Sequence, residues 1–143
     1  ALEAAADPHG TWMPPKRVRA NFAQPEDLSD ISAILNRSKR PLILAGFDAA
    51  RTGAADAVRQ LAETYSIPVI TTYKAKGVLP EHHSLALGAA GLSPLADGIL
   101  LPVCRAADVV LLVGYDPIEM RTGWIDPFAS EARIIEISPG PYD

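Results

Sequence analysis

Apolar and polar positions along this chain form blocks with two different periods. Short, mostly apolar runs are typical of strands that are covered on both faces of a parallel sheet. Such runs occupy residues 41–46, 67–72, 108–114 and 133–137, and residues 85–88 offer a shorter additional strand. The strongest run, DVVLLVG at 108–114, is closed by glycine, as is PLILAG at 41–46.

Between these runs, apolar residues recur at the spacing of an α-helix. One helix is predicted to begin at Pro25, with proline in its first turn, and to bury a face made of Leu28, Ile31, Ile34 and Leu35. A second helix is predicted over residues 52–66. A third follows Ser93-Pro94 and reaches residue 107, and we expect Pro102 to break or kink it because proline lacks an amide hydrogen.

The alternation of strands and helices predicts an α/β fold, a three-layer, doubly wound parallel sheet of the Rossmann-like type. If the strand that ends at Gly46 is the first, right-handed crossovers allow the strand order 3-2-1-4-5. Gly46 and Gly114 would then flank the same crevice. Residues 1–24, which are rich in proline and poor in apolar periodicity, are predicted to be an extended lead-in or linker, and residues 25–143 the domain.

The charge, the lengths of the apolar runs and the cysteine content argue against several classes of function. A chain of 143 residues with 13 basic and 17 acidic side chains has no long run of one sign, which argues against nucleic-acid binding. No apolar run approaches the roughly 20 residues that span a bilayer, so we expect no membrane segment. Cys104 is the single cysteine, which fits a reducing cytoplasm and predicts a buried packing residue.

Candidate ligand contacts follow the carboxyl ends of the predicted strands, where open α/β sheets bind ligands. Backbone amides after Gly46 could meet an anion, yet the glycine fingerprint of dinucleotide sites is absent, so a plain turn is the alternative. Acids after the later strands could accept hydrogen bonds from a ribose, or could simply be solvated. The threonines and the lysine could contact phosphate or cap a loop. The candidates are Gly46, Phe47, Thr71, Thr72, Lys74, Gly114, Tyr115, Asp116, Glu136 and Ile137.

The sequence predicts neither a catalytic centre nor a metal site. His82 and His83 are adjacent, so in a strand they would point to opposite faces, and neither His9 nor Cys104 stands at a ligand spacing from them. No serine-histidine-aspartate order, nucleophile elbow or carboxylate pair is present. A surface loop is the simpler interpretation of the histidines.

Several ordered segments together resemble the central domain of thiamine-diphosphate-dependent enzymes, the acetolactate synthase and 2-oxo acid decarboxylase superfamily. They are residues 40–46, 67–72, 76–83, 87–88, 107–114 and 134–137, and Gly88 joins the candidate contacts with them. The segment Gly114-Tyr115-Asp116-Pro117-Ile118-Glu119 is similar to a loop of the catabolic acetolactate synthases.

This resemblance implies a parent enzyme of three domains that decarboxylates and joins 2-oxo acids to give acetolactate. Its activating glutamate, and the Gly-Asp-Gly to Asn motif that holds Mg²⁺ and diphosphate, would lie in the other two domains. The fragment is therefore expected to have no activity alone. The missing domains would be its partners, and the full-length protein a homo-oligomer.

The resemblance also bears on nucleotide binding, because some relatives hold FAD or ADP in this domain. Flavin binders commonly carry a glycine cluster after the first strand, where this chain has Phe47 and Asp48. Flavin binders also usually show an Asp-rich version of the last-strand motif, which here is Glu136-Ile137-Ser138. Both departures favour a domain without FAD, and FAD or ADP bound in this domain is the alternative. The alternatives are a stand-alone FAD- or adenine-nucleotide-binding module without enzymatic activity, and an interaction domain that only supports subunit packing.

Overall fold

The computed structural model describes residues 25–139, and the predicted lead-in at 1–24 lies outside them. The helices are α1 (Pro25–Arg37), α2 (Phe47–Arg51), α3 (Ala55–Tyr65) and α4 (Pro94–Ala106). The strands are β1 (Pro41–Ala45), β2 (Val69–Thr72), β3 (Ala86–Ala90), β4 (Val109–Val113) and β5 (Arg133–Ile137). Three short 3₁₀ helices are η1 (Tyr73–Ala75), η2 (Pro117–Glu119) and η3 (Thr122–Trp124).

All five strands pair in parallel in one sheet, in the order β3-β2-β1-β4-β5. The predicted fold class and strand order are therefore confirmed. Strand β1 pairs with β4 over its full length, from Pro41 opposite Val109 to Ala45 opposite Val113. Because the chain moves outward from β1 in both directions, the two central strands end beside each other at the point where the winding reverses.

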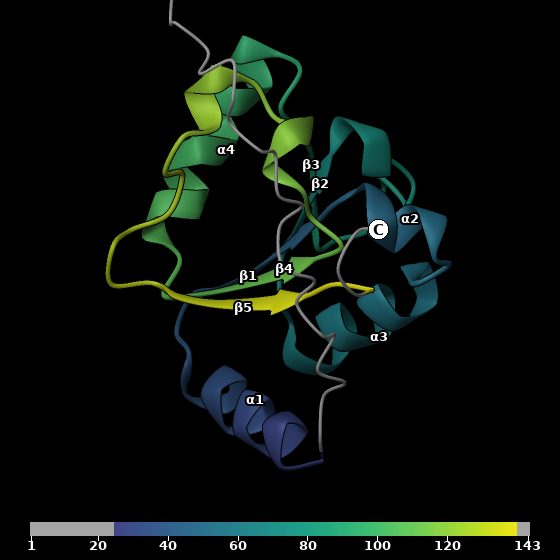
Figure 1. Cartoon of the computed structure of the whole chain (residues 1–143), viewed down its shortest axis with the longest axis vertical. Coiled ribbons are helices and arrows are strands. Elements are labelled where there is room, and N and C mark those ends of the chain that lie inside the picture. The colour runs from purple at the N-terminus through teal and green to yellow at the C-terminus, as the bar shows by residue number, and fades with distance from the viewer. Residues whose placement is uncertain (1–24, 140–143) are drawn as a thin grey trace, which may run out of the picture.

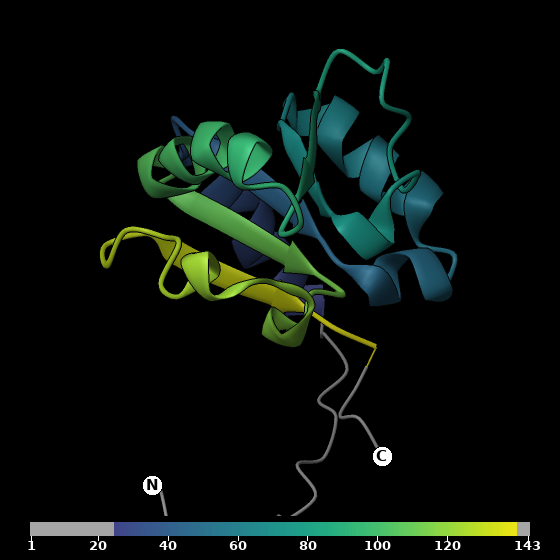
Figure 2. The ribbon, with the colours of Figure 1, turned by 90° about the horizontal axis from the view of Figure 1, so that it is seen from above.

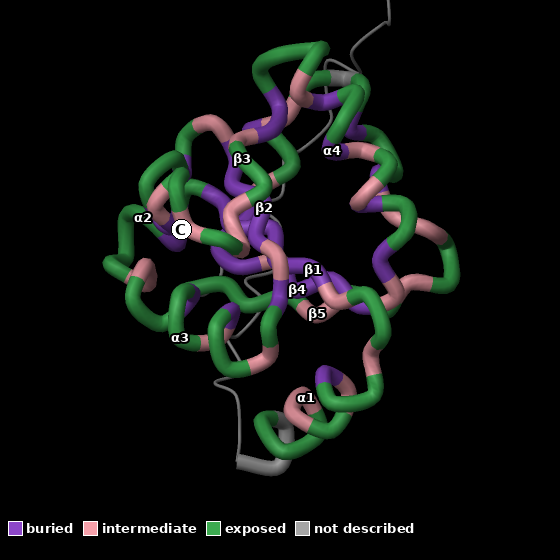
Figure 3. The backbone as a smooth tube through the Cα atoms, turned by 180° about the vertical axis from the view of Figure 1, so that it is seen from behind, coloured by how far each residue is buried: buried purple, intermediate pink, exposed green. Residues whose placement is uncertain are grey.

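Alternating side chains of the central strands divide the core into two clusters. Ile43, Ala45 and Leu111 face α1, α2 and α3, whereas Leu42, Leu44 and Val110 face α4. Figure 1 shows α4 on one side of the sheet and α1 and α3 on the other. The strands are the most buried part of the molecule, and the helices turn exposed residues outward (Figure 3). The result is the three-layer arrangement that continuous apolar strands require.

The outer strand β5 departs from that pattern. It lies at the edge of the sheet (Figure 2), and Ile134 and Ile137 are exposed. The loop that leads to β5 includes η2 and η3, and it packs Trp124 and part of Phe128 against the α4 side of the core. The apolar run thus predicted the strand but not that both of its faces are largely exposed, with Ile135 alone among its residues packed against the core.

Two helix predictions need correction. Leu28 is 58% exposed, so the buried face of α1 begins only at Ile31, because the helix meets the sheet through its carboxyl-terminal half. The predicted helix at 52–66 is preceded by a separate helix, α2, at 47–51. The two are separated at Gly53, whose φ of +75° favours glycine and ends α2.

The predicted break at Pro102 is wrong, because α4 continues through it to Ala106. Proline removes one hydrogen bond, and the carbonyl that loses it belongs to Gly98. Gly98 is exposed, so water can satisfy this carbonyl, and the helix persists. On its other face α4 buries Leu100 and Cys104, as the sequence predicted for the cysteine. No helix of the described residues is long and apolar enough to cross a membrane.

Candidate functional site

The carboxyl ends of β1 and β4 are in direct backbone contact. The amide of Gly46 donates to the carbonyl of Val113 over 2.9 Å, and the amide of Asp48 donates to the carbonyl of Gly114 over 3.1 Å. A Cβ added at Gly46 would lie 2.3 Å from the Gly114 carbonyl oxygen and 2.4 Å from Cα of Tyr115. The crevice expected between these two strand ends is therefore filled by the turns that follow them.

The carboxylate of Glu119 lies at the centre of this contact and is almost fully buried, with 4% of the residue exposed. Its Oε1 accepts the backbone amide of Phe47 over 2.9 Å. Its Oε2 accepts the hydroxyl of Thr72 over 2.6 Å. A single side chain thus connects the segments that follow β1, β2 and β4.

The sequence places Glu119 through a local capping box. Asp116 caps η2, accepting the amide of Ile118 over 2.9 Å, and the Glu119 carboxylate accepts the amide of Asp116 in return. Proline at the first position of η2 suits this turn, since its fixed φ is already helical. The pattern Asp-x-x-Glu is a recognisable helix-start signal, and it could have marked Glu119, which sequence reasoning missed.

Two further polar groups at this end of the sheet are buried. The Asp48 carboxylate accepts the Arg51 Nε over 2.9 Å, so its negative charge is paired. Burial, followed by the nearby Glu119 carboxylate, raises the pKa of Tyr115 to about 12, which keeps the phenol neutral at physiological pH.

The structure brings some of the residues predicted to contact a ligand close together and places others far apart. Those that meet around Glu119 are Gly46, Phe47, Thr72, Gly114, Tyr115 and Asp116. Thr71 is buried in β2, and the carbonyl of Ile137 accepts the Gly114 amide over 2.8 Å. Lys74 is exposed over the ring of Tyr73, Gly88 lies on edge strand β3, and Glu136 is exposed on β5. Within residues 25–139, no side-chain hydrogen bond or ion pair joins these last three to Glu119.

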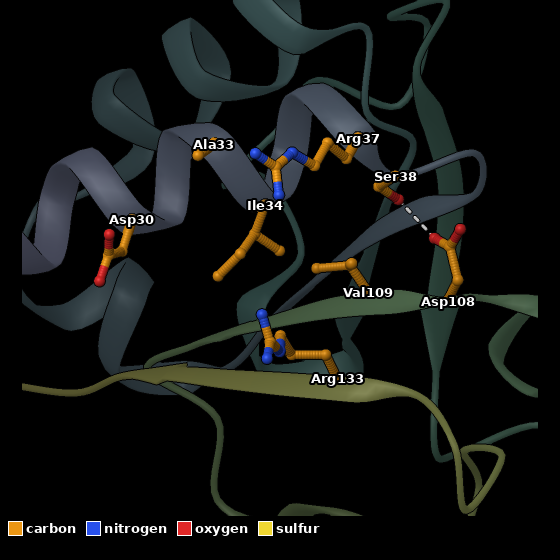
Figure 4. A pocket seen from close by; sticks show the side chains of 8 residues that line it. All are labelled: Asp30, Ala33, Ile34, Arg37, Ser38, Asp108, Val109 and Arg133. Carbon is orange, nitrogen blue, oxygen red and sulfur yellow. Dashed lines mark hydrogen bonds between the residues drawn. The ribbon is translucent and has the colours of Figure 1, made fainter.

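A hollow of about 500 Å³ lies at the opposite end of the sheet, between α1 and the starts of β4 and β5. Figure 4 shows Arg37 and Arg133 on opposite sides of it, with Ile34 and Val109 between them. Partial burial disfavours ionised Asp108, but hydrogen bonds from the Ser38 hydroxyl and the amides of residues 39 and 40 outweigh it and lower the pKa of Asp108. This carboxylate joins the end of α1 to β4.

The described part of the chain offers no cluster of three or more histidine, cysteine, aspartate or glutamate residues that could hold a metal ion. His83 instead lies 3.1 Å from a Glu63 oxygen, measured from its Nε2, and His82 is exposed. A second hollow, of about 560 Å³, is lined mainly by apolar side chains of the segment after β4. The first hollow, by contrast, is lined by two carboxylates, Asp30 and Asp108, beside Arg37 and Arg133.

Comparison with known proteins shows the family to which this chain belongs. Residues 28–143 match the family model of the thiamine pyrophosphate enzyme central domain. The chain belongs to this family. The resemblance found in the sequence is thereby confirmed.

Similar curated proteins point the same way. The chain is 37% identical over 120 residues to a protein of Methanocaldococcus jannaschii named probable acetolactate synthase large subunit, covering 83% of this chain and 20% of that protein. It is 32% identical over 146 residues to the protein of the same name from Methanococcus aeolicus, covering 99% and 24%. A mouse protein named 2-hydroxyacyl-CoA lyase 1 is 31% identical over 121 residues, covering 85% and 18%.

A solved structure from Mycobacterium smegmatis, of an enzyme assigned to the thiamin diphosphate-dependent class, shares the fold. Its TM-score is 0.66 at 22% identity, with 90% of this chain and 25% of that chain covered. The central-domain chain thus spans about a fifth to a quarter of the length of the relatives named here.

Proposed function

We propose that this chain is the structural central domain of a larger thiamine-diphosphate-dependent enzyme. The parent would decarboxylate a 2-oxo acid and join the product to a second one, as an acetolactate synthase does. The observation that carries this proposal is the family match over residues 28–143, together with relatives named acetolactate synthase large subunit. Thiamine diphosphate and Mg²⁺ would be held by the parts of the parent outside these residues.

The chemistry of the described residues supports a scaffolding role. The two carboxylates buried at the strand ends, where open α/β sheets bind ligands, are both engaged within the chain. Glu119 accepts hydrogen bonds from Phe47 and Thr72, and Asp48 pairs with Arg51. The fragment by itself would therefore be inactive.

Exposed apolar side chains on α4 support a proposal about the surface that the rest of the parent covers. Leu95 and Ile99 are 80% and 67% exposed and stand four residues apart, so they share one side of the helix. Because the relatives are about four to five times longer than this chain, we propose that the remaining domains of the same polypeptide cover this side. The full-length protein would be a cytoplasmic homo-oligomer, and the lone buried Cys104 is in keeping with a reducing compartment.

An activity assay tests the proposal. The 143-residue chain and the full-length parent are each incubated with pyruvate, thiamine diphosphate and Mg²⁺, and acetolactate is measured. We expect product from the parent only. Turnover by the fragment alone would overturn the scaffolding role, and a parent that cleaves a 2-hydroxyacyl-CoA but leaves pyruvate untouched would replace the proposed reaction.

A further inference from the structure

Nucleotide binding in this domain would require space where the winding of the sheet reverses. In this chain the turns after β1 and β4 approach so closely that a single methyl group at Gly46 would overlap two backbone atoms. Gly114 is equally confined: with φ of +56° it adopts the left-handed conformation, and a Cβ there would lie 2.4 Å from the Ala49 amide nitrogen. A pyrophosphate is far larger than a methyl group.

The amide that an incoming phosphate would need is also taken. In open α/β folds a phosphate is held by backbone amides at the start of the helix that follows a strand. The corresponding amide here belongs to Phe47, and it donates to Glu119 over 2.9 Å. The second oxygen of Glu119 is held by the buried Thr72 hydroxyl, which fixes the carboxylate in place.

We propose that Glu119 is an internal anion that occupies the phosphate position of this fold, so that the central domain rejects FAD and ADP. A nucleotide phosphate would have to displace Glu119 from Phe47 and Thr72. It would then lie beside a carboxylate that has lost its partners in a buried site, and like charges repel strongly there. The same carboxylate joins the segments after β1, β2 and β4 through its hydrogen bonds to Phe47, Thr72 and Asp116, and we call this connection the clamp.

This proposal stands on geometry alone and does not depend on the reaction of the parent enzyme. Isothermal titration of the 143-residue chain with ADP and with FAD tests the first part. We expect no binding tighter than about 1 mM. A micromolar dissociation constant for either compound would overturn the proposal and favour a nucleotide-binding module.

The clamp is tested by amide hydrogen exchange in Glu119→Gln, which keeps the shape of the side chain and removes its charge. A hydrogen bond to a charged group is stronger than one to a neutral group, so we expect the Phe47 amide to exchange roughly tenfold faster in the variant. The matched control is Glu131→Gln, at an exposed site whose carboxylate accepts a hydrogen bond from the neighbouring Ser130. Unchanged exchange at Phe47 in Glu119→Gln would refute the clamp.

A second variant covers the case in which Glu119→Gln does not fold. Thr72→Val keeps the volume at residue 72 and removes the donor to Oε2. Because the freed carboxylate is then less well fixed, the Phe47 amide is expected to exchange faster there as well. If both variants fold, their combined effect on stability should be smaller than the sum of the single effects, and strict additivity would count against a shared clamp.

Discussion

Replacing Gly46 with alanine is the sharpest test of the closed strand ends. Gly46 has φ of −103° and ψ of −176°, an extended conformation that alanine adopts without strain. Any loss of stability must therefore come from the added methyl group. That group would lie 2.3 Å from the Gly114 carbonyl oxygen, 2.4 Å from Cα of Tyr115 and 2.9 Å from Oε1 of Glu119.

The expected magnitude follows from which atoms must move. Overfilling a packed interior costs about 1–3 kcal/mol when side chains can rearrange. Two of the three atoms here belong to backbone, so relief requires the turns after β1 and β4 to separate. That movement weakens the hydrogen bonds from Gly46 to Val113 and from Asp48 to Gly114, each worth about 1 kcal/mol. We expect Gly46→Ala to lower the free energy of unfolding by about 3–5 kcal/mol.

The assay is urea unfolding of the 143-residue chain, followed by far-ultraviolet circular dichroism. Its matched control is Gly98→Ala in α4, where an added Cβ would meet nothing within 4 Å. Because glycine disfavours the interior of an exposed helix, the control should gain about 0.5–1 kcal/mol. Overpacking typically lowers the free energy of unfolding by at least about 1 kcal/mol. A smaller loss for Gly46→Ala would refute the reasoning, because the strand ends would then have room for the added methyl group.

Three further predictions concern other parts of the chain. Asp108→Asn should destabilise the protein at pH 7. The amides of residues 39 and 40 donate to different oxygens of Asp108, and asparagine keeps only one acceptor oxygen. Because folding lowers the pKa of Asp108, the unfolding curves of variant and wild type should converge as the pH falls below 3.8. Burial raises the pKa of Cys104 from 9.0 to about 11, so the thiol of the unfolded chain ionises at a lower pH than the thiol of the folded chain. Between these pH values the free energy of unfolding of the wild type should therefore fall more steeply with pH than that of Cys104→Ala. Equal slopes for the two proteins would contradict this prediction. Because Leu95 and Ile99 are exposed in this chain, Leu95→Ser and Ile99→Ser should each change the free energy of unfolding in urea by no more than about 0.5 kcal/mol, and a larger loss would show that these side chains pack within the domain.

Some residues of the candidate site could be predicted from the sequence and others could not, for reasons that differ from residue to residue. Gly46 and Gly114 could be placed together because both close apolar strands, and parallel strands end at the same edge of a sheet. Glu119 could not, because its partner Phe47 is 72 residues away and no local pattern records that distance. Lys74 and Glu136 lie at or near the carboxyl ends of strands just as Thr72 does, yet they are exposed. Which residue after a strand turns inward depends on the packing of the next segment.

The sequence alone predicted the five strands and the longer helices, because an uninterrupted apolar run can be buried only between two layers. It allowed the observed strand order without dictating it, since right-handed crossovers leave few ways to order the strands. Tertiary structure decided the rest. It left Leu28 exposed beyond the edge of the sheet, and it let α4 continue through Pro102, where water reaches the carbonyl of Gly98. It also placed the Glu119 carboxylate against Phe47 and Thr72 at the carboxyl ends of β1 and β2, because that position is set by contacts between segments far apart in sequence.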